Sequence, residues 1–413
     1  MIFKNLLIVT DGNLNDGTGS GITLGNLFKE WDSDRLGVYS VNNDRRNGGI
    51  LKGQACFRNA EKDGSEASSK SIKVRGRSGF IKSFIANSKI RPYLTLFAPV
   101  SVTEKAVQEI QSFQAEIVYG PVSDIFSIRR LLKIKKLTSA RLSIVFFDDL
   151  IDRYDGLLFS WLYKWVHLKF LRHIVSIADA TYVCSEAMRI EYEPIFGVKF
   201  DVVSNPVDLD LVQVYRSVVT RMDPFKIVYA GTVNSKNVSN LRLMSLAVKH
   251  LAAVGHPVVF EIYTFGTKLD AVQEQFQHFG KNVIVGLAPM GDHELFSILG
   301  QASILYIPMD FTAESVKSIR LSYLTKQPLY MALGVPLIVH GPLTIHVVEH
   351  ALRHKYAEVV LEDSADSLSE KIVEHIIDYE KFLRATDFGL TYARDFHCIK
   401  KVQSKFYKRL LAN

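Results

Sequence analysis

A glycine-rich run near the start of the chain could bring backbone groups close to a ligand. Gly19 and Gly21 lie in the middle of this run, which extends from Gly17 to Gly25 and separates an apolar stretch from an amphipathic one. Glycines in such a turn let backbone N–H groups and a helix N-terminus approach a phosphate or a sugar. The third glycine is misplaced for a G-x-G-x-x-G dinucleotide fingerprint, so a purely structural turn is the alternative.

Two adjacent carboxylates follow an apolar run further along the chain. Asp148 and Asp149 come after Ile144 to Phe147, so we expect them at the C-terminal end of a buried parallel strand, where ligands of doubly wound sheets bind. Neighbouring side chains at a strand end point to opposite sides, so only one can face a substrate. We predict that Asp149 is the catalytic residue that orients or deprotonates an acceptor hydroxyl, and that Asp148 bonds nearby backbone N–H groups. The alternative is that both carboxylates only cap the following turn.

Length and composition limit the classes of protein. A chain of 413 residues is longer than one hydrophobic core usually grows, which predicts two domains. The apolar stretch from Leu6 to Val9 is too short for a signal peptide, and basic residues interrupt the window from Leu157 to Ala178, so we expect no membrane-spanning helix. Three dispersed cysteines, Cys56, Cys184 and Cys398, fit packing roles in a reducing cytoplasm.

The basic excess is confined to the N-terminal half. Met1 to Asn205 contains 28 Lys and Arg against 22 Asp and Glu, which is +6 of the total net charge of +7. This bias suits an anionic partner, either phosphate or a membrane surface, and a solvated basic face is the alternative. We expect no nucleic acid as a partner. Two aromatic and basic stretches, Phe80 to Phe97 and Leu157 to Arg172, are candidates for peripheral association with an anionic membrane. For the second stretch, a buried helix that covers a sheet is the alternative.

Strand-like runs alternate with helical patterns, and this series starts twice. A strand, a glycine turn and a helix open the chain at Leu6, and a second such unit opens at Phe225 after the turn-prone stretch Asn205 to Pro224. The pattern predicts an α/β protein with two doubly wound, Rossmann-like domains joined by a hinge in that stretch. The predicted strands are 6–10, 35–41, 116–120, 141–147, 180–185, 200–205, 225–231, 258–266, 283–287, 303–308, 336–341 and 357–361.

Two further segments have a distinct composition. Asn43 to Arg77 is rich in Gly, Ser, Lys and Asn with little periodicity, which is typical of a long mobile loop. Phe396 to Leu411 spaces apolar residues as an amphipathic helix does and has a basic outer face. We expect this last helix to cross back onto the first domain.

The segment from Phe225 to Asn237 resembles the opening of the nucleotide-binding domain in the glycosyl transferases group one family. In that family an Arg and a Lys after the Tyr-Ala-Gly turn bind the diphosphate of the donor as a cationic clamp. Lys236 matches the lysine, whereas Thr232 stands where arginine is usual. The resemblance therefore implies a weakened clamp to which another cation contributes.

The resemblance is closest from Ile304 to Pro342, where a turn enters a helix through Thr-Lys and a Tyr-Met-Ala motif precedes the next strand. It implies that Lys326 lies near a helix N-terminus, where both its charge and the N–H groups favour an anion. The family's acidic residue before Tyr-Met-Ala, which binds the donor ribose, is Leu329 here, and Glu314 is a candidate substitute. The other donor-binding residues that the motif implies are Arg320, Ser322 and Thr325.

The N-terminal half resembles the family more faintly. The matching segments are Phe147 to Asp149, Thr181 to Met188 and Val203 to Asp208. The whole resemblance implies a GT-B fold, with an acceptor-binding domain over 1–205, a nucleotide-sugar-binding domain over 206–390 facing it across a cleft, and a C-terminal helix over 391–413.

The activity implied by the resemblance is metal-independent transfer of a hexose from a nucleotide-sugar to a saccharide or lipid-linked acceptor, usually with retention of configuration. The expected setting is bacterial surface polysaccharide synthesis in the cytoplasm, at the inner face of the membrane, with no cofactor. A non-catalytic sugar-nucleotide-binding or interaction subunit and a nucleotide-sugar 2-epimerase are the alternatives. Two metal-like patterns, Asp208-Leu-Asp210 and His346-Val-Val-Glu349-His350, lie at the hinge and in a sheet-covering helix, so we expect no metal there.

Overall fold

In a computed structural model, the chain divides into two units. The structure describes residues 2–12, 14, 18–40, 50–52, 96, 99–151, 160–216, 224–265, 269–289 and 291–412. Unit 1 comprises Met1–Val203 together with Lys405–Asn413, and unit 2 comprises Ser204–Ser404. The C-terminal end of the chain therefore belongs to the same unit as the N-terminal end.

Unit 1 is built on a seven-stranded sheet in the order β3-β2-β1-β4-β5-β6-β7. All neighbouring strands pair in parallel except β3, which pairs antiparallel with β2. Every residue of β1 is buried, as expected for a central strand covered on both faces. The strands are β1 Leu6–Thr10, β2 Leu36–Ser40, β3 Ile50–Lys52, β4 Ile117–Pro121, β5 Arg141–Phe146, β6 Ala180–Val183 and β7 Asp201–Val202.

Side-chain caps set the start of most helices in unit 1. Thr18, Thr103, Asp124 and Ser185 each accept a hydrogen bond from a backbone N–H in the first turn of the helix that follows. The helices are α1 Gly19–Phe28, α5 Glu104–Phe113, α6 Ile125–Leu137, α7 Ser160–Ile177, α8 Glu186–Phe196 and the C-terminal α18 Ile399–Leu411, whose last turns from Lys405 belong to this unit.

The end of α18 is held in unit 1 by aromatic packing. Phe406 lies edge-on to Phe28 of α1, Tyr119 of β4 and Tyr182 of β6, with ring centroids 5.1 to 5.6 Å apart. The Tyr407 hydroxyl donates to the Leu27 carbonyl at 2.7 Å. The apolar face of this amphipathic helix is thus part of the core of unit 1.

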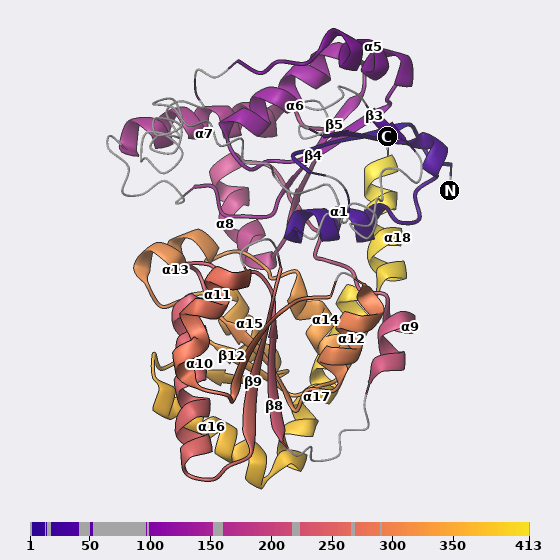
Figure 1. Ribbon diagram of the computed structural model, residues 1–413. Coiled ribbons are helices and arrows are strands. Elements are labelled where there is room, and N and C mark those ends of the chain that lie inside the picture. Colours follow the sequence, from indigo (N-terminus) through magenta and orange to yellow (C-terminus); the bar gives the residue numbers. More distant parts are fainter. Residues whose placement is uncertain are drawn as a thin grey trace. The chain divides into compact units, whose positions relative to one another are not determined.

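Unit 2 has a six-stranded parallel sheet in the order β10-β9-β8-β11-β12-β13. The order reverses at β8, since β9 follows on one side and β11 on the other. Strands β8 and β9 lie side by side in Figure 1. The strands are β8 Phe225–Ala230, β9 Val258–Thr264, β10 Val283–Leu287, β11 Ile304–Pro308, β12 Leu337–His340 and β13 Glu358–Val360.

Two apolar cores pack on the faces of this sheet. One contains residues of α10, α11 and α16, and the other contains residues of α9, α12, α14 and α15. A π-helical turn over Ala393–His397 joins α17 to α18. The helices are α9 Leu209–Val212, α10 Val238–Ala253, α11 Leu269–Phe276, α12 Asp292–Gly300, α13 Ala313–Ile319, α14 Lys326–Leu333, α15 His346–His354, α16 Ala365–Ile377 and α17 Tyr379–Tyr392.

The predicted α/β class with two Rossmann-like domains is confirmed by these two sheets. Each of the twelve predicted strand regions contains a strand. The prediction of a loop throughout Asn43 to Arg77 is wrong at β3, because Ile50–Lys52 pairs with the edge of β2. Such a short edge strand has no periodicity of its own in the sequence, and the rest of that segment lies outside the described residues. Among the described helices, none combines the length and the apolar character needed to cross a membrane.

Candidate functional site

The candidate site lies in unit 2, at the C-terminal ends of its two central strands. The loops after β8 and β11 are neighbours because these strands pair in the sheet. They also flank the position at which the strand order reverses. Open α/β sheets bind ligands in the crevice that forms at such a position. Most of the predicted donor-binding residues lie in these two loops and in the turn before α14.

The loop over 231–237 is fixed by side-chain hydrogen bonds to its own backbone. The Tyr229 hydroxyl donates to the Thr232 carbonyl at 2.9 Å. The Asn237 side-chain amide donates to the Tyr229 hydroxyl at 3.0 Å and to the Thr232 carbonyl at 2.9 Å. The Lys236 backbone N–H donates to Asn234 Oδ1 at 2.9 Å. The loop therefore holds Thr232 exposed and Lys236 half-buried on a rigid backbone.

Lys326, at the start of α14, reaches this loop. Its Nζ lies 4.0 Å from the centroid of the Tyr229 ring, which places the ammonium over the aromatic face. Gly231 makes room for it, since a Cβ there would overlap Lys326 Nζ and lie 2.8 Å from the Tyr229 hydroxyl. In the part of the chain that the structure describes, the Lys326 ammonium has no carboxylate partner. Desolvation lowers the pKa of Lys326 to about 7.

The N-terminus of α14 adds to this positive potential. Thr325 occupies the N-cap position in a helical conformation, and its side chain makes no capping hydrogen bond. The first turn of a helix carries the positive end of the dipole and attracts anions. The Lys326 ammonium and the start of α14 therefore place positive charge beside Gly231.

The turn over 320–325 is anchored at both ends. The His346 backbone N–H donates to the Arg320 carbonyl at 2.8 Å, and the Asn205 amide donates to the Thr325 carbonyl at 2.9 Å. Ser322 lies between these anchors, and its buried Oγ has no hydrogen-bond partner among the described residues. The Ser322 hydroxyl is therefore available for a further hydrogen bond.

A third anchor is a buried histidine that the sequence did not reveal. His397 Nε2 lies 3.0 Å from the Tyr323 hydroxyl, and its Nδ1 lies 3.0 Å from Ser204 Oγ. Its carbonyl accepts from the Val207 N–H at 2.7 Å. Burial lowers the pKa of His397 to about 4. The neutral imidazole therefore connects both ends of unit 2 to the turn that carries Lys326.

Asp310 connects the loop after β11 to the loop after β8, and it too was missed by the sequence analysis. Its N–H donates to the Lys236 carbonyl at 3.1 Å, and its carboxylate accepts from Ser239 at 2.5 Å and from the Thr312 N–H at 2.6 Å. Glu314 lies exposed in the first turn of α13. The signal that could have revealed Asp310 is an aspartate two residues after the apolar run that forms β11.

Leu329 has a packing role in unit 2. It is partly buried and packs against the apolar core beside α14. The next residue, Tyr330, uses its hydroxyl to accept from the Ala230 N–H at 3.0 Å. This position of the helix therefore contributes to the core and to the end of β8, and it supplies no carboxylate.

The predicted phosphate turn of unit 1 follows β1. Thr18 caps α1 by accepting from the Gly21 N–H at 3.1 Å, and Gly19 is exposed at the start of this helix. Nearby, the buried Arg130 donates to Asp11 at 2.7 Å, across the position between β1 and β4 at which this strand order reverses. Gly19 and Gly21 belong to a different unit from Lys326, so their role in donor binding stays a prediction.

Asp149 lies at the end of β5 as predicted, and it is completely buried. Its Oδ1 accepts from the Ile151 N–H at 3.1 Å and from the Tyr192 hydroxyl at 3.2 Å. Tyr192 in turn accepts from the Leu150 N–H at 3.0 Å. The hydrogen bond to a nearby backbone N–H that we predicted for Asp148 is therefore made by Asp149. Its catalytic role stays a prediction.

The two metal-like patterns have other partners. Asp208 caps α9, and Asp210 pairs with Lys400 at 2.7 Å. His350 is bonded on both ring nitrogens by the Tyr356 and Tyr392 hydroxyls, at 2.9 and 2.8 Å. Burial lowers the pKa of His350 to about 2, so it is a neutral member of a buried network.

No protein-family model and no curated protein matches the sequence. The fold, in contrast, matches many solved structures. Anabaena HepE in complex with UDP is 12% identical with a TM-score of 0.63, and the match covers 99% of this chain and 100% of that one. Sucrose-phosphate synthase from Thermosynechococcus elongatus is 11% identical with a TM-score of 0.63 over the same shares. A glycosyltransferase from Rickettsia africae is 12% identical with a TM-score of 0.60 over 99% of each chain. The chain therefore has the GT-B fold of these glycosyltransferases, with one Rossmann-like sheet in each unit.

Proposed function

We propose that the protein transfers a sugar from a nucleotide-sugar to an acceptor hydroxyl. The observation that carries this proposal is the Lys326 ammonium, which has no carboxylate partner among the described residues and lies against Gly231 at the N-terminus of α14. This arrangement suits the diphosphate of a donor. Lys236, on the fixed loop after β8, supplies a second cation.

The chemistry that these groups supply is stabilisation of the leaving group. As the bond between the sugar and the diphosphate breaks, negative charge builds up on the departing nucleoside diphosphate. Lys326 and the N-terminus of α14 neutralise that charge, and Tyr229 fixes the direction of the lysine chain. Because the loop and the turn are already anchored, little reorganisation is needed when the donor binds.

The structural neighbours support a nucleotide-sugar as the donor. Anabaena HepE was crystallised with UDP, with UDP and glucose, and with UDP-glucose. For this chain we propose hexose transfer, without a metal or another cofactor and with retention of configuration. The proposed acceptor is a saccharide or a lipid-linked saccharide of bacterial surface polysaccharide synthesis, used in the cytoplasm at the inner face of the membrane. Asp149 remains the proposed acceptor-activating residue, and it would need to be uncovered from its present turn.

A non-catalytic binding subunit is the second candidate. It is favoured by Leu329, whose packing leaves this position of α14 without a carboxylate for a ribose. It is also favoured by Thr232, which gives the loop a hydroxyl in place of a guanidinium. A nucleotide-sugar 2-epimerase is a third candidate with the same fold, which would act on the donor without an acceptor.

One experiment separates these candidates. Calorimetry with nucleoside diphosphates tests binding, and a screen for donor hydrolysis over several nucleotide-sugars tests turnover. Binding of a nucleoside diphosphate with slow hydrolysis of one nucleotide-sugar supports the transferase. Binding without turnover supports the non-catalytic subunit, and a change of the sugar without hydrolysis supports the epimerase. No binding of any nucleotide would overturn the proposal.

A further inference from the structure

Helix α7 of unit 1 exposes large apolar side chains in its first two turns. Trp161, Leu162 and Trp165 are 69%, 42% and 53% exposed. The opposite face of the helix is buried through Tyr163 and Leu171, among others. The helix therefore covers unit 1 with one face and presents two indoles to solvent with the other, so the buried-helix alternative describes only half of it.

The helix that carries these indoles and its neighbour α6 are basic. Helix α7 has three Lys or Arg residues and no Asp or Glu over its 18 residues. Helix α6, which packs against it, has no acidic residue over 13 residues and five Lys or Arg residues, of which Arg130 is buried and paired with Asp11 while the other four remain toward the surface. Lys169 lies one turn after Trp165, with its Nζ 3.5 Å from the centroid of that ring. Arg172 follows on the same side of the helix and is exposed.

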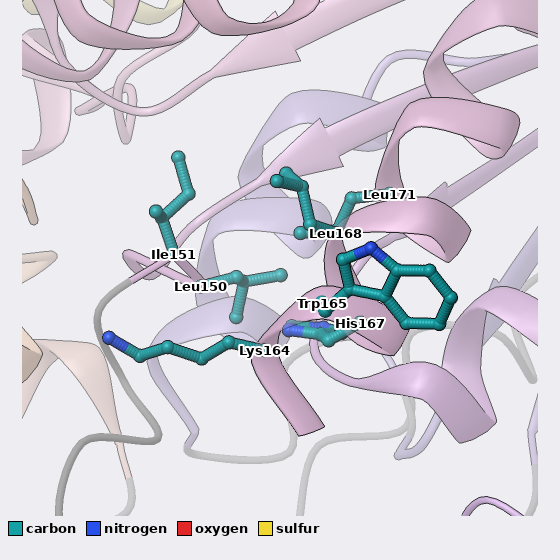
Figure 2. A pocket seen from close by; sticks show the side chains of 7 residues that line it. All are labelled: Leu150, Ile151, Lys164, Trp165, His167, Leu168 and Leu171. Carbon is teal, nitrogen blue, oxygen red and sulfur yellow. The ribbon is translucent and has the colours of Figure 1, made fainter. Parts of the chain in front are cut away.

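A small pocket adjoins the exposed indole. It has a volume of about 170 Å³ and is lined mainly by apolar side chains of α7 and of the turn after β5 (Figure 2). The side chains of Lys164 and Trp165 lie on different sides of this pocket. The lining residues are Leu150, Ile151, Lys164, Trp165, His167, Leu168 and Leu171.

We infer that the exposed face of α7 binds the surface of an anionic membrane. Indole rings favour the boundary between head groups and acyl chains, because they have an apolar body and a polar N–H. Lysine and arginine beside them are attracted by anionic head groups, and α6 and α7 carry no carboxylate to oppose this attraction. Helix α8, which also packs against α7, has three glutamates, and Arg189 pairs with two of them, Glu186 and Glu193. Trp161, Leu162 and Trp165 enter the boundary, while Lys169 and Arg172 contact lipid phosphates.

Exposed indoles and a leucine beside lysine and arginine favour a bilayer over a protein or a nucleic acid as the partner. A protein interface of this charge would need a matching acidic surface, and a nucleic-acid site would not require the exposed Leu162 between two indoles. The inference rests on the proposed function only for the location of the acceptor at a membrane. The nucleotide site belongs to unit 2, so nucleotide binding can be measured separately in every variant.

The tryptophans provide a direct test. The chain has three, and Trp31 is only 3% exposed in the core of unit 1, so Trp161 and Trp165 are the indoles that can meet a lipid. The full chain is mixed with vesicles of phosphatidylcholine, with or without phosphatidylglycerol. We expect a blue shift and quenching by brominated lipid only with the anionic vesicles, and weakening of both effects by salt.

Two variants locate the surface. The double substitution Trp161→Ser and Trp165→Ser should lower the vesicle partition constant roughly tenfold or more, because the apolar area is lost. The double substitution Lys169→Glu and Arg172→Glu should lower it roughly 25-fold or more, from about fivefold for each lost cation. Matched controls are Ile377→Ser, at another exposed apolar residue, and Lys249→Glu, at a lysine of α10; both should bind vesicles as the wild type does.

The outcomes are distinct. Vesicle binding that is unchanged in both double variants, or that ignores lipid charge and salt, would overturn the inference. The inference would also be overturned if the chain binds RNA as tightly as vesicles and this binding depends on Lys169 and Arg172. Wild-type circular dichroism and cooperative thermal unfolding in the double variants show that the fold of unit 1 is intact, and normal UDP binding shows that the site in unit 2 is intact. If the wild-type chain binds vesicles but does not bind UDP, that result counts against the proposed function and leaves the membrane inference standing.

Discussion

The ammonium of Lys326 lies 4.0 Å from the centroid of the ring of Tyr229, the tyrosine of β8. The ring itself is fixed, because its hydroxyl donates to Thr232 and accepts from Asn237. Lys326 is the first residue of α14, and this contact directs its side chain toward the loop that follows β8, nearly a hundred residues earlier in the sequence. The predictions for the nucleotide site depend on this pair.

Replacing Lys326 by Met should weaken binding of a nucleoside diphosphate about 10- to 150-fold. This range corresponds to about 1.5–3 kcal/mol for a hydrogen bond to a charged group. Lys326→Arg should recover only part of the affinity, since the larger guanidinium does not fit beside Gly231. Lys249→Met, at the far end of α10, is the matched control. Equal affinities in wild type and Lys326→Met, measured by calorimetry, would contradict the assignment.

Nucleotide binding should take up a proton above neutral pH. Lys326 has a pKa lowered to about 7 by desolvation, so much of it is neutral in the free protein at pH 8. A bound diphosphate favours the charged form and raises this pKa, so the affinity should fall as the pH rises above about 7. Calorimetry in buffers of different ionisation enthalpy should give an uptake approaching about one proton at pH 8. The Lys326→Met variant should show none of this uptake.

The close approach at Gly231 should make this position intolerant of a side chain. A Cβ at Gly231 overlaps Lys326 Nζ, whereas a Cβ at Gly286 of β10 meets only the Tyr263 ring, at 3.7 Å. Gly231→Ala should therefore displace the lysine and reduce nucleotide affinity roughly tenfold, with the fold retained. Gly286→Ala is expected to bind the nucleotide normally. Normal binding by both variants would show that the lysine position is not required.

His397 should contribute to stability in a pH-dependent manner. Its folded pKa is lowered to about 4, below the ordinary value of 6.5, so the unfolded chain binds more protons between these values. Its contribution is fully present above pH 6.5 and is lost as the pH falls toward 4, with a slope of at most about 1.4 kcal/mol per pH unit. Denaturant unfolding of His397→Gln should show a shallower loss of stability over this range than the wild type.

Tyr323→Phe tests whether His397 positions the turn that carries Lys326. It removes the hydroxyl that bonds His397 Nε2 and leaves the histidine in place. We expect weaker nucleotide binding in Tyr323→Phe and in His397→Gln, and a double variant no weaker than the worse of the two. Additive losses would show that the two residues act separately.

Asp149 can be assigned by comparing two substitutions. Asp149→Ala removes the acceptor of the Ile151 N–H and the Tyr192 hydroxyl, and should lower the free energy of unfolding by about 1–3 kcal/mol. Asp149→Asn keeps an acceptor oxygen, so the turn should survive. If Asp149 activates the acceptor, this variant should lose turnover by about 100-fold or more with donor binding intact. Turnover within about threefold of wild type would reduce Asp149 to a residue of the turn.

The sequence by itself was sufficient for the strands and for the class of fold. Buried parallel strands are continuous apolar runs such as Leu6 to Thr10 and Ile304 to Pro308, and each run is locally visible. The second start of the series at Phe225 was enough to predict two sheets. The edge strand β3 escaped because three residues carry no periodicity and depend on pairing with β2.

The tertiary structure decided which polar groups work together. Lys326 was visible in its motif, but its contact with Tyr229 and Gly231 depends on the pairing of β8 with β11. The hydrogen bond between His397 and Tyr323 joins residues 74 positions apart, and no local pattern marks either of them. The burial of Asp149 beneath Tyr192 likewise arises from packing between a strand end and a later helix. Hydrogen bonds between distant side chains depend on where the backbone brings them, and only the folded chain sets that placement.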